Sequence, residues 1–389
     1  MLEGIRVLDL TRMLAGPYAT MMLGDLGAEV IKIESPDGDE IRRMGPPFVN
    51  GESAYFMAVN RNKKSVVIDL QDPRGREVFE RLVKASDVMI DNFRPGVLDR
   101  LGIGPARVRE LNPKLVSCSI SSFGEEGPMS ELPAFDLVIQ AWSGAMSVTG
   151  EPGGAPVRLG IPLGDLAGGI YASLAVTSAL VRRGKTGVGD RIELSLLDCL
   201  TAMTTYLSQY YFANGAVPGP QGSRHMSCVT YGAYRAGDGW IVVGVFTERF
   251  WEGFCRALER PQWATDERYV SNELRVRNRK GLEEAIQQAL SSKPAAEWLR
   301  RLHAEKIPAA PVLTLDKTLG LEQLALRGMI TSVTHPVAGT IRTLADPILR
   351  KAPSPSPLLG QHTAAVLAEA AGLGAAEIAA LRDAGVIRA

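Results

Sequence analysis

Short apolar runs alternate with helix-forming segments over the N-terminal half of the chain, and this alternation constrains the fold more than any other feature. Strands are predicted at IRVLDL, AEVIKIE, SVVIDL and DVMIDN, and helices between them at GPYATMMLGDLG and DPRGREVFERLVKAS. Such alternation is typical of βαβ units, whose parallel sheet is covered by helices. Because most of these strands are apolar throughout, we expect them to be buried on both faces. The sequence therefore predicts an α/β fold.

The segment DPRGREVFERLVKAS carries clear helix signals. Asp72 can cap the helix, and Pro73 suits its first turn. One apolar stripe is formed by Val78, Phe79, Leu82 and Val83. Further along the chain we expect strands at LVSCSISSFG and DRIELSL, and longer helices over residues 135–150 and 197–212.

Two stretches rich in proline divide the chain. The first, NGAVPGPQGSR at 214–224, breaks any periodic element and is interpreted as a linker. We therefore assign residues 1–213 to a large domain and residues 225–328 to a smaller α+β domain, which opens with a hairpin at GAYRAGDGWIVVGVF. The second stretch, APSPSPLLG, belongs to residues 329–389, which we expect to form a linker and a helical pair that returns to the large domain.

The balance of charge narrows the set of partners. The chain holds 43 basic and 43 acidic residues, so no global field attracts a polyanion, and we expect neither nucleic acid nor a membrane surface as a partner. The N-terminus MLEGIRVLDL carries an acid where a signal peptide carries bases. The uncharged apolar run Leu166–Val181 has 16 residues, fewer than the ~20 that span a bilayer. We expect it to be a core helix of a cytoplasmic protein.

Cysteine and histidine usage argues against a metal centre. Four cysteines lie far apart, without CxxC spacing, at Cys118, Cys199, Cys228 and Cys255. Buried free thiols in a reducing compartment are the favoured interpretation. The chain has only four histidines and no HExxH motif, so no metal site is predicted.

Three familiar catalytic motifs do not match this chain. GKT at 184–186 lacks the first glycine of a Walker A motif, because position 179 is Ala179. LAGPYA after the first strand lacks GxGxxG spacing, and no GxSxG elbow occurs. Nucleotide hydrolysis, dinucleotide redox chemistry and α/β-hydrolase chemistry therefore lack their usual markers.

The glycine-rich segment LGIPLGDLAGG, residues 159–169, holds a single charge, Asp165. Its carboxylate can cap the long apolar helix that follows, and the residues alone favour this role and a chemical one equally. The helix start also offers backbone donors to an oxyanion. A bulky ligand could approach the carboxylate through the glycines beside it, Gly160, Gly164, Gly168 and Gly169. Capping and nucleophilic attack are compatible in one residue.

Further motifs extend over nearly the whole chain and carry a resemblance to a known family. They are RVLDLTRMLAGPYATMMLGDLGAEVIKIE, NRNKKSVVIDL, DNFRPGVLDRLG, FDLVIQAWSG, PLGDLAGG and RRGKTGVGDRIELSLLD, with LLGQHTAAVLAEAAGL and LRDAGVI near the C-terminus. In this order they resemble the family III coenzyme A transferases. That group contains formyl-CoA, carnitine and other acyl-CoA transferases, together with the α-methylacyl-CoA racemases.

The resemblance implies a large doubly wound, Rossmann-like domain, a small domain, and an interlocked homodimer in which each chain threads through the other. In the family's transferases, the aspartate matching Asp165 attacks the acyl-CoA thioester, which gives a mixed anhydride and CoA thiolate. The thiolate then forms an aspartyl-CoA thioester, from which the acceptor acid takes CoA. This covalent catalysis uses acyl-CoA and a small carboxylic acid as substrates and no tightly bound cofactor. Because carboxylates are ionised at neutral pH, no external base is expected.

The resemblance also places coenzyme A along the large domain. Leu14 and Ala15 would line the adenine or pantetheine channel, and residues 68–71 would form a second wall. Arg94 and Arg100, which without the resemblance would be interpreted as surface charge, would bind phosphate oxygens. The residues expected along the coenzyme are Leu14, Ala15, Ile68, Gln71, Asn92, Phe93, Arg94, Arg100 and Asp136.

Departures from the family pattern narrow the reaction. Leu14 stands where several oxalate-using members have a glutamine, and QGSRHMSCVTYG lacks their glycine-tetrad lid, so transfer between other acids is favoured. Phe135 stands where racemases have a histidine. Because racemisation needs two opposed acid/base groups, a transferase is favoured over a racemase. A non-catalytic CoA-binding paralogue, in which Asp165 serves only as a cap, is the remaining alternative.

Three basic side chains are candidates for binding the acceptor acid. Arg158 precedes the Asp165 loop, and Arg224 and His225 lie at the domain boundary. Each can hold the second carboxylate of a diacid, although each taken singly is equally well interpreted as a solvated charge. The hypothesis is a small dicarboxylate acceptor such as succinate, malate or itaconate.

Overall fold

A computed structural model describes residues 1–388, which divide into two compact units. Unit 1 consists of Met1–Ala145, Arg158–Gln209 and the chain from Glu322 to the C-terminus, and unit 2 of Met146–Val157 and Tyr210–Leu321. Unit 2 thus differs from the predicted small domain, 225–328, by including Met146–Val157 and by beginning and ending earlier.

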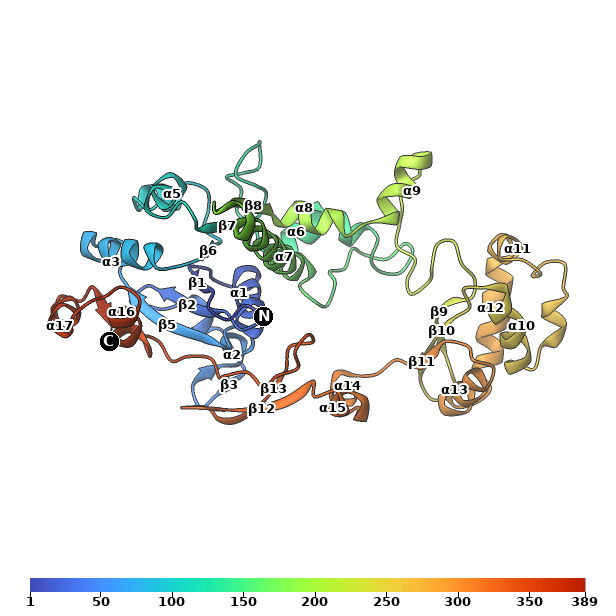
Figure 1. Cartoon of the computed structure of the whole chain (residues 1–389). Helices are drawn as coiled ribbons and strands as arrows, with labels where there is room; N and C mark the ends of the chain where they lie inside the picture. Colours follow the sequence, from blue (N-terminus) through green and yellow to red (C-terminus); the bar gives the residue numbers. More distant parts are fainter. Residues whose placement is uncertain (389) are drawn as a thin grey trace. The chain divides into compact units, whose positions relative to one another are not determined.

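Unit 1 is built on a seven-stranded sheet with the order β14-β5-β2-β1-β6-β7-β8 (Figure 1). Its strands are β1 Arg6–Asp9, β2 Glu29–Glu34, β5 Lys63–Ile68, β6 Val88–Asp91, β7 Val116–Ser121, β8 Arg191–Ser195 and β14 Ile387–Arg388. All neighbours pair parallel except β14 with β5. The predicted α/β fold with a large parallel sheet is confirmed. The chain moves outward from β1 to β5 and then returns to β6, so the strand order reverses between β1 and β6, where such sheets bind ligands.

Hydrophobic clusters on both faces bury the central strands, as predicted, whereas β8 leaves Arg191 and Glu193 exposed. On one face Leu8 and Ile31 pack with side chains of α3 and α16, and on the other Val7 and Val30 pack with α1 and α7. The helices of unit 1 are α1 Ala15–Asp25, α2 Ala54–Val59, α3 Pro73–Lys84, α4 Val97–Arg100, α5 Pro105–Leu111, α6 Asp136–Trp142, α7 Leu163–Thr186, α8 Leu196–Ala202, α15 Glu322–Leu326, α16 Thr363–Glu369 and α17 Ala375–Asp383, with the 3-10 turn η1 Glu40–Arg43.

The predicted signals of α3 are confirmed. Asp72 accepts a hydrogen bond from the backbone N–H of Arg74, Pro73 opens the helix, and all four residues of the apolar stripe are buried. The predicted helix over 135–150 instead ends at Trp142 in α6, just before a glycine with positive φ, and continues only as the turn η2 Ala145–Ser147.

The second long helix predicted, 197–212, is two helices in the structure. Thr205 has a φ of 44°, which separates α8 from α9 Tyr206–Asn214. Two short antiparallel pairs complete this part of the chain: β3 Phe48–Val49 with β4 Glu52–Ser53, and β12 Ile330–His335 with β13 Gly339–Leu344.

Unit 2 contains a three-stranded antiparallel sheet, β11-β10-β9, with helices around it. Its elements are β9 Tyr231–Arg235, β10 Trp240–Gly244, α10 Glu248–Ala257, η3 Pro261–Ala264, α11 Asn272–Arg277, α12 Arg279–Leu290, α13 Ala295–Ala304, β11 Ala309–Pro311 and α14 Leu315–Leu319. The predicted hairpin is confirmed as β9 and β10. Trp251, Phe254 and Trp298 are buried in its core.

Helix α7 has 24 residues and, by length and composition, could cross a membrane. In unit 1 it packs against α1 and α8 and directs Ala172 and Val176 into the hydrophobic cluster. The four cysteines are all buried, as predicted.

Candidate functional site

A cavity of about 570 Å³ lies beside the N-terminus of α7, within unit 1. Its walls come from the loop between β1 and α1, the segment after β6, the start of α6 and the residues that lead into α7. The predicted site residues that line it are Leu14, Ala15, Asn92, Phe93, Arg94, Asp136, Arg158 and Asp165.

A second cavity, of about 530 Å³, lies at the carboxyl ends of β1, β2, β5 and β6. The predicted coenzyme residues Ile68, Gln71 and Arg100 line it. The segment 92–94 lines both cavities and makes them neighbours. The structure thus brings the candidate nucleophile and all the predicted coenzyme residues to one edge of the sheet, at the reversal of strand order.

The expectation that Asp165 caps its helix is wrong. Helix α7 begins at Leu163 after Pro162, so Asp165 lies within the first turn, and the cap position makes no side-chain hydrogen bond. Oδ1 of Asp136 instead accepts the backbone N–H of Gly164 at 2.8 Å and that of Asp165 at 3.3 Å. Since a proline side chain has no acceptor, a carboxylate from α6 satisfies these orphan N–H groups.

Most of the glycines around Asp165 allow close packing within the protein. A Cβ on Gly164 would lie 3.0 Å from Oδ1 of Asp136, and one on Gly168 only 2.2 Å from a leucine side chain of α8. Gly169 meets α1 in the same way. Gly160 lines the cavity and has nothing within 4 Å of its would-be Cβ. The expectation of ligand space therefore fits Gly160 and is wrong for the other three.

The environment of Asp165 raises its pKa. Burial, followed by the negative charge of Asp136, raises the pKa of Asp165 to about 7, and no cation or donor to its carboxylate offsets them. Tyr55, in the same cavity, has a pKa raised to about 12 by burial and then by Asp165. This environment departs from the expectation that the nucleophile is fully ionised at neutral pH, because a carboxyl with a raised pKa keeps its proton to a higher pH than a free aspartic acid does.

Four arginines of the described chain line the two cavities without a carboxylate partner: Arg12, Arg94, Arg100 and Arg158. An unpaired guanidinium suits phosphate or carboxylate ligands. Arg158 lines the cavity of Asp165, and Arg94 lines both cavities. The sequence analysis missed Arg12 and Tyr55; the signal for Arg12 was its place directly after the first strand, at the carboxyl edge of the sheet.

Arg224 and His225 belong to unit 2. There Nε of Arg224 lies 2.9 Å from the Glu283 carboxylate. The ring of His225 meets two aromatic rings edge-on, with centroid distances of 5.6 and 5.9 Å. Of the three predicted acceptor residues, Arg158 is the one that lines the cavity of Asp165.

Two predicted coenzyme residues are engaged with the protein itself. Asn92 accepts the backbone N–H of Arg12 and donates to its carbonyl, both at 2.8 Å, and so joins the loops after β1 and β6. Asp136 accepts from Gly164 through one oxygen and from Nε2 of Gln140 through the other, at 2.6 Å. Both side chains hold the walls of the cavity together.

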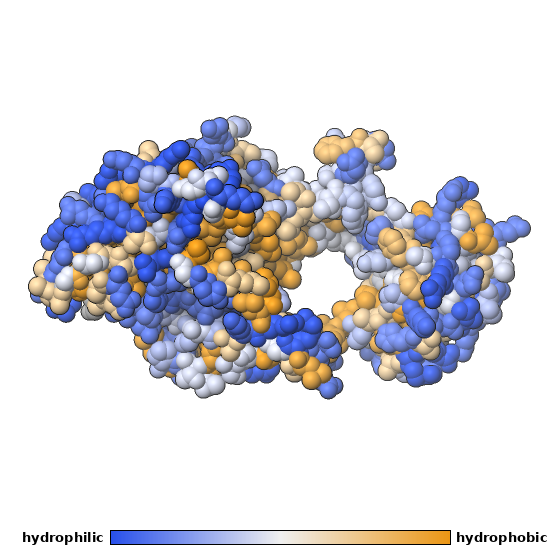
Figure 2. Space-filling model, in the orientation of Figure 1, coloured by the Kyte–Doolittle hydropathy of each residue, from blue (hydrophilic) through white to orange (hydrophobic). Residues whose placement is uncertain are grey.

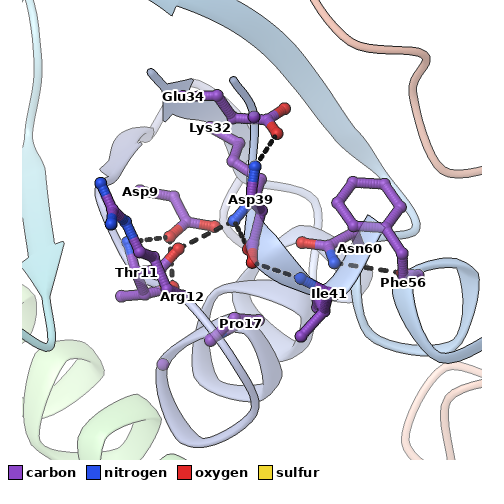
Figure 3. A network of polar contacts seen from close by, with 12 residues as sticks. Asp9, Thr11, Arg12, Pro17, Lys32, Glu34, Asp39, Ile41, Phe56 and Asn60 are labelled. Carbon is purple, nitrogen blue, oxygen red and sulfur yellow. Dashed lines mark hydrogen bonds and ion pairs between the residues drawn. The ribbon is translucent and has the colours of Figure 1, made fainter. Parts of the chain in front are cut away.

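A buried charge network supports the loop after β1 (Figure 3). Nζ of Lys63 lies 2.9 Å from the Asp9 carboxylate, and Nζ of Lys32 lies 2.8 Å from that of Asp39. Lys32 also donates to the carbonyl of Thr11 at 2.8 Å, and Asp9 accepts the backbone N–H of Thr11 at 2.9 Å. These bonds hold the loop at Thr11, just before residues 12–15, which line the two cavities.

The comparisons with known proteins agree with this geometry. Residues 2–363 of this chain match the sequence pattern of CoA-transferase family III. Succinyl-CoA:glutarate CoA-transferase of Mus musculus is 39% identical over 95% of this chain and 86% of its own length. Acetyl-CoA:oxalate CoA-transferase of Acetobacter aceti is 39% identical over 84% and 85%. The crystal structure of a CaiB/BaiF family protein from Brucella suis superposes with a TM-score of 0.84, at 35% identity, over 95% of this chain and 98% of that one. The chain therefore belongs to CoA-transferase family III and is a CoA-transferase, as the resemblance predicts.

Proposed function

We propose that this enzyme transfers CoA between small dicarboxylic acids, with Asp165 as the nucleophile. One observation carries the proposal: the Asp165 carboxylate is free of cations and lines a cavity that adjoins a second, arginine-lined cavity. The acids named in the two relatives, succinate, glutarate and oxalate, support the substrate class. Arg158 would hold the distal carboxylate of such an acid.

In the proposed cycle, the ionised Asp165 attacks the thioester carbonyl of the donor and expels CoA thiolate, leaving a mixed anhydride. The thiolate attacks the Asp165 carbonyl of the anhydride and releases the donor acid. The acceptor carboxylate then attacks the aspartyl-CoA thioester, which gives a second anhydride and thiolate. Attack of that thiolate on the acceptor carbonyl forms the new acyl-CoA and regenerates Asp165.

The cavity supports transfer over racemisation. Phe135 lines it at the position where racemases have a histidine, and a phenyl ring can neither accept nor donate the α-proton. Arg94 and Arg100 would bind the phosphates of CoA, and the shared wall at 92–94 would lie along its pantetheine arm, which leads the thioester to Asp165.

We also propose that the enzyme works as the interlocked homodimer implied by the family resemblance. Figure 2 shows hydrophobic residues gathered over α7 and over α9. Ile170, Leu174 and Val181 are exposed on α7, and α9 has no buried residue at all. Exposed apolar surface of this extent is typical of protein interfaces. Light scattering at micromolar concentration should give twice the mass of one chain; a monomer would contradict the proposal.

The test of the transfer reaction is direct. The enzyme is incubated with succinyl-CoA and a panel of mono- and dicarboxylic acids, and new CoA esters are identified by mass spectrometry. We expect dicarboxylic acceptors to react fastest and the tryptic peptide that contains Asp165 to carry a CoA adduct. Asp165→Asn is the matched control. Preferred monocarboxylic acceptors would exclude the substrate class, and an adduct on another residue would exclude the nucleophile.

A further inference from the structure

A buried amide on α6 links two parts of the cavity wall. Gln140 is fully buried. Its Nε2 donates to Oδ2 of Asp136 at 2.6 Å, and its Oε1 accepts the backbone N–H of Leu159 at 2.8 Å. Leu159 follows Arg158 directly, so the amide reaches the segment of the candidate acceptor residue on one side and the carboxylate that caps α7 on the other.

The contacts form one continuous chain of hydrogen bonds. It runs from the Leu159 N–H through Gln140 to Asp136, whose Oδ1 then accepts the N–H groups of Gly164 and Asp165. The orientation of the Gln140 amide is fixed, because the three backbone groups at the two ends are all donors and must meet oxygen atoms. The segment that leads into α7 is thereby held to α6 at both ends.

We propose that Gln140 is a positioning residue of the transfer reaction, which acts through Asp136 on Asp165 and through Leu159 on Arg158. The proposal rests on Asp165 being the nucleophile. A buried network in which every side-chain oxygen and nitrogen atom has a partner favours one geometry, because breaking a link leaves a polar atom unpaired. The network also places a negative charge beside the nucleophile, where it opposes ionisation of Asp165. The other charged or titratable side chains that line this cavity are Tyr55, Arg94 and Arg158.

Single substitutions break the chain of hydrogen bonds. In Asp136→Asn, the N–H groups of the new amide face the N–H groups of Gln140. If the Gln140 amide turned by 180°, its N–H groups would face the backbone N–H of Leu159 instead. In Gln140→Glu, two carboxylates face each other where 2.6 Å now separates donor and acceptor. Gln140→Met removes both bonds without adding charge. We expect each variant to lower kcat by about 10- to 100-fold, since small misplacements of reacting groups have effects of this size.

The double variant Asp136→Asn/Gln140→Glu restores every bond. The amide at 136 still accepts from Gly164 and now donates to the carboxylate at 140, whose second oxygen accepts from Leu159. The net charge equals that of the wild type, but the negative charge lies one hydrogen bond farther from Asp165. We expect kcat to return to within about threefold of wild type, while the acid limb of the pH profile moves down by roughly half a pH unit or more.

The measurements are kcat and KM for both acids from pH 5 to 9, with thermal melting of every variant. Gln262→Glu, at an exposed position of unit 2, is the matched control for an added carboxylate and should behave as wild type. A double variant no more active than the weaker single variant would overturn the proposal. So would recovery of the melting temperature with no recovery of kcat and no shift of the acid limb. The CoA adduct on wild-type Asp165 tests the nucleophile separately, since it involves none of these variants.

Discussion

Two aspartates near the paired helices α1 and α7, the fully buried Asp9 and the half-buried Asp165, have opposite environments. Asp9 ends β1 and lies against Lys63, with further hydrogen bonds from the hydroxyls of Thr11 and Thr20. Burial favours its protonated form, but Lys63 and Lys32 reverse the effect and lower the pKa of Asp9. Asp165 has no such cation, and its pKa rises to about 7. The paired carboxylate neutralises a buried cation, whereas the charge of the unpaired one is disfavoured in the folded protein, as is typical of functional sites.

The largest effect on activity should follow from replacing Asp165, the unpaired aspartate of the two. Asp165→Asn replaces the nucleophilic carboxylate with an amide of the same shape, so transfer between succinyl-CoA and a dicarboxylic acid should fall by about 10³-fold or more, because covalent catalysis is lost. The rate is measured by chromatography of the CoA esters. CoA itself should still bind, since its predicted residues are unchanged. Residual transfer above one tenth of wild type would leave Asp165 as a structural residue only.

Replacing Asp9, the paired aspartate, should instead lower the free energy of unfolding. Asp9→Asn leaves Lys63 buried without its carboxylate partner, whereas Lys32 keeps Asp39. Breaking a buried ion pair costs about 3–5 kcal/mol. Urea unfolding followed by far-ultraviolet circular dichroism measures the loss. Asp37→Asn, at an exposed position of the following loop, should change the free energy of unfolding by less than about 0.5 kcal/mol. Equal stability of the two variants would remove the distinction between the carboxylates.

The corresponding substitution at the other aspartate, Asp165→Asn, should raise the free energy of unfolding, whereas Asp9→Asn should lower it. Since the folded pKa of Asp165 is raised from 3.8 to about 7, the folded state binds more protons than the unfolded state between these values. The contribution of Asp165 to stability therefore falls as pH rises from about 4 to 7 and is constant above. Asp165→Asn escapes this loss and should be more stable by about 1–3 kcal/mol at pH 8, with little difference at pH 3. Melting temperatures at both pH values decide the matter.

Local signals were readable in the sequence and distant contacts were not. Asp72 caps α3 two residues away, so spacing and residue type suffice to predict it. Asp165 has the same local signals, but the N–H groups of its helix are satisfied by Asp136, from a helix whose start is 28 residues before Gly164. A sequence pattern does not report which loop folds against which helix. The strand pattern predicted the parallel sheet because its central strands are buried on both faces. The link from Gln140 to Leu159 depends instead on tertiary packing.

Two arginines, Arg158 and Arg224, likewise differ in whether they have a partner of opposite charge, and we expect smaller effects from replacing them. Arg158 lines the cavity of Asp165 without a carboxylate partner, whereas Arg224 is paired with Glu283 in unit 2. Arg158→Ala should raise KM for a dicarboxylic acceptor about tenfold, because it removes a charged hydrogen bond to the distal carboxylate, and should leave KM for a monocarboxylic acceptor within twofold. Arg224→Ala should change either value less, because its guanidinium already has a partner. Steady-state kinetics with both acceptor classes measures the difference, and an equal effect of Arg158→Ala on both classes would show that this guanidinium does not bind the distal carboxylate.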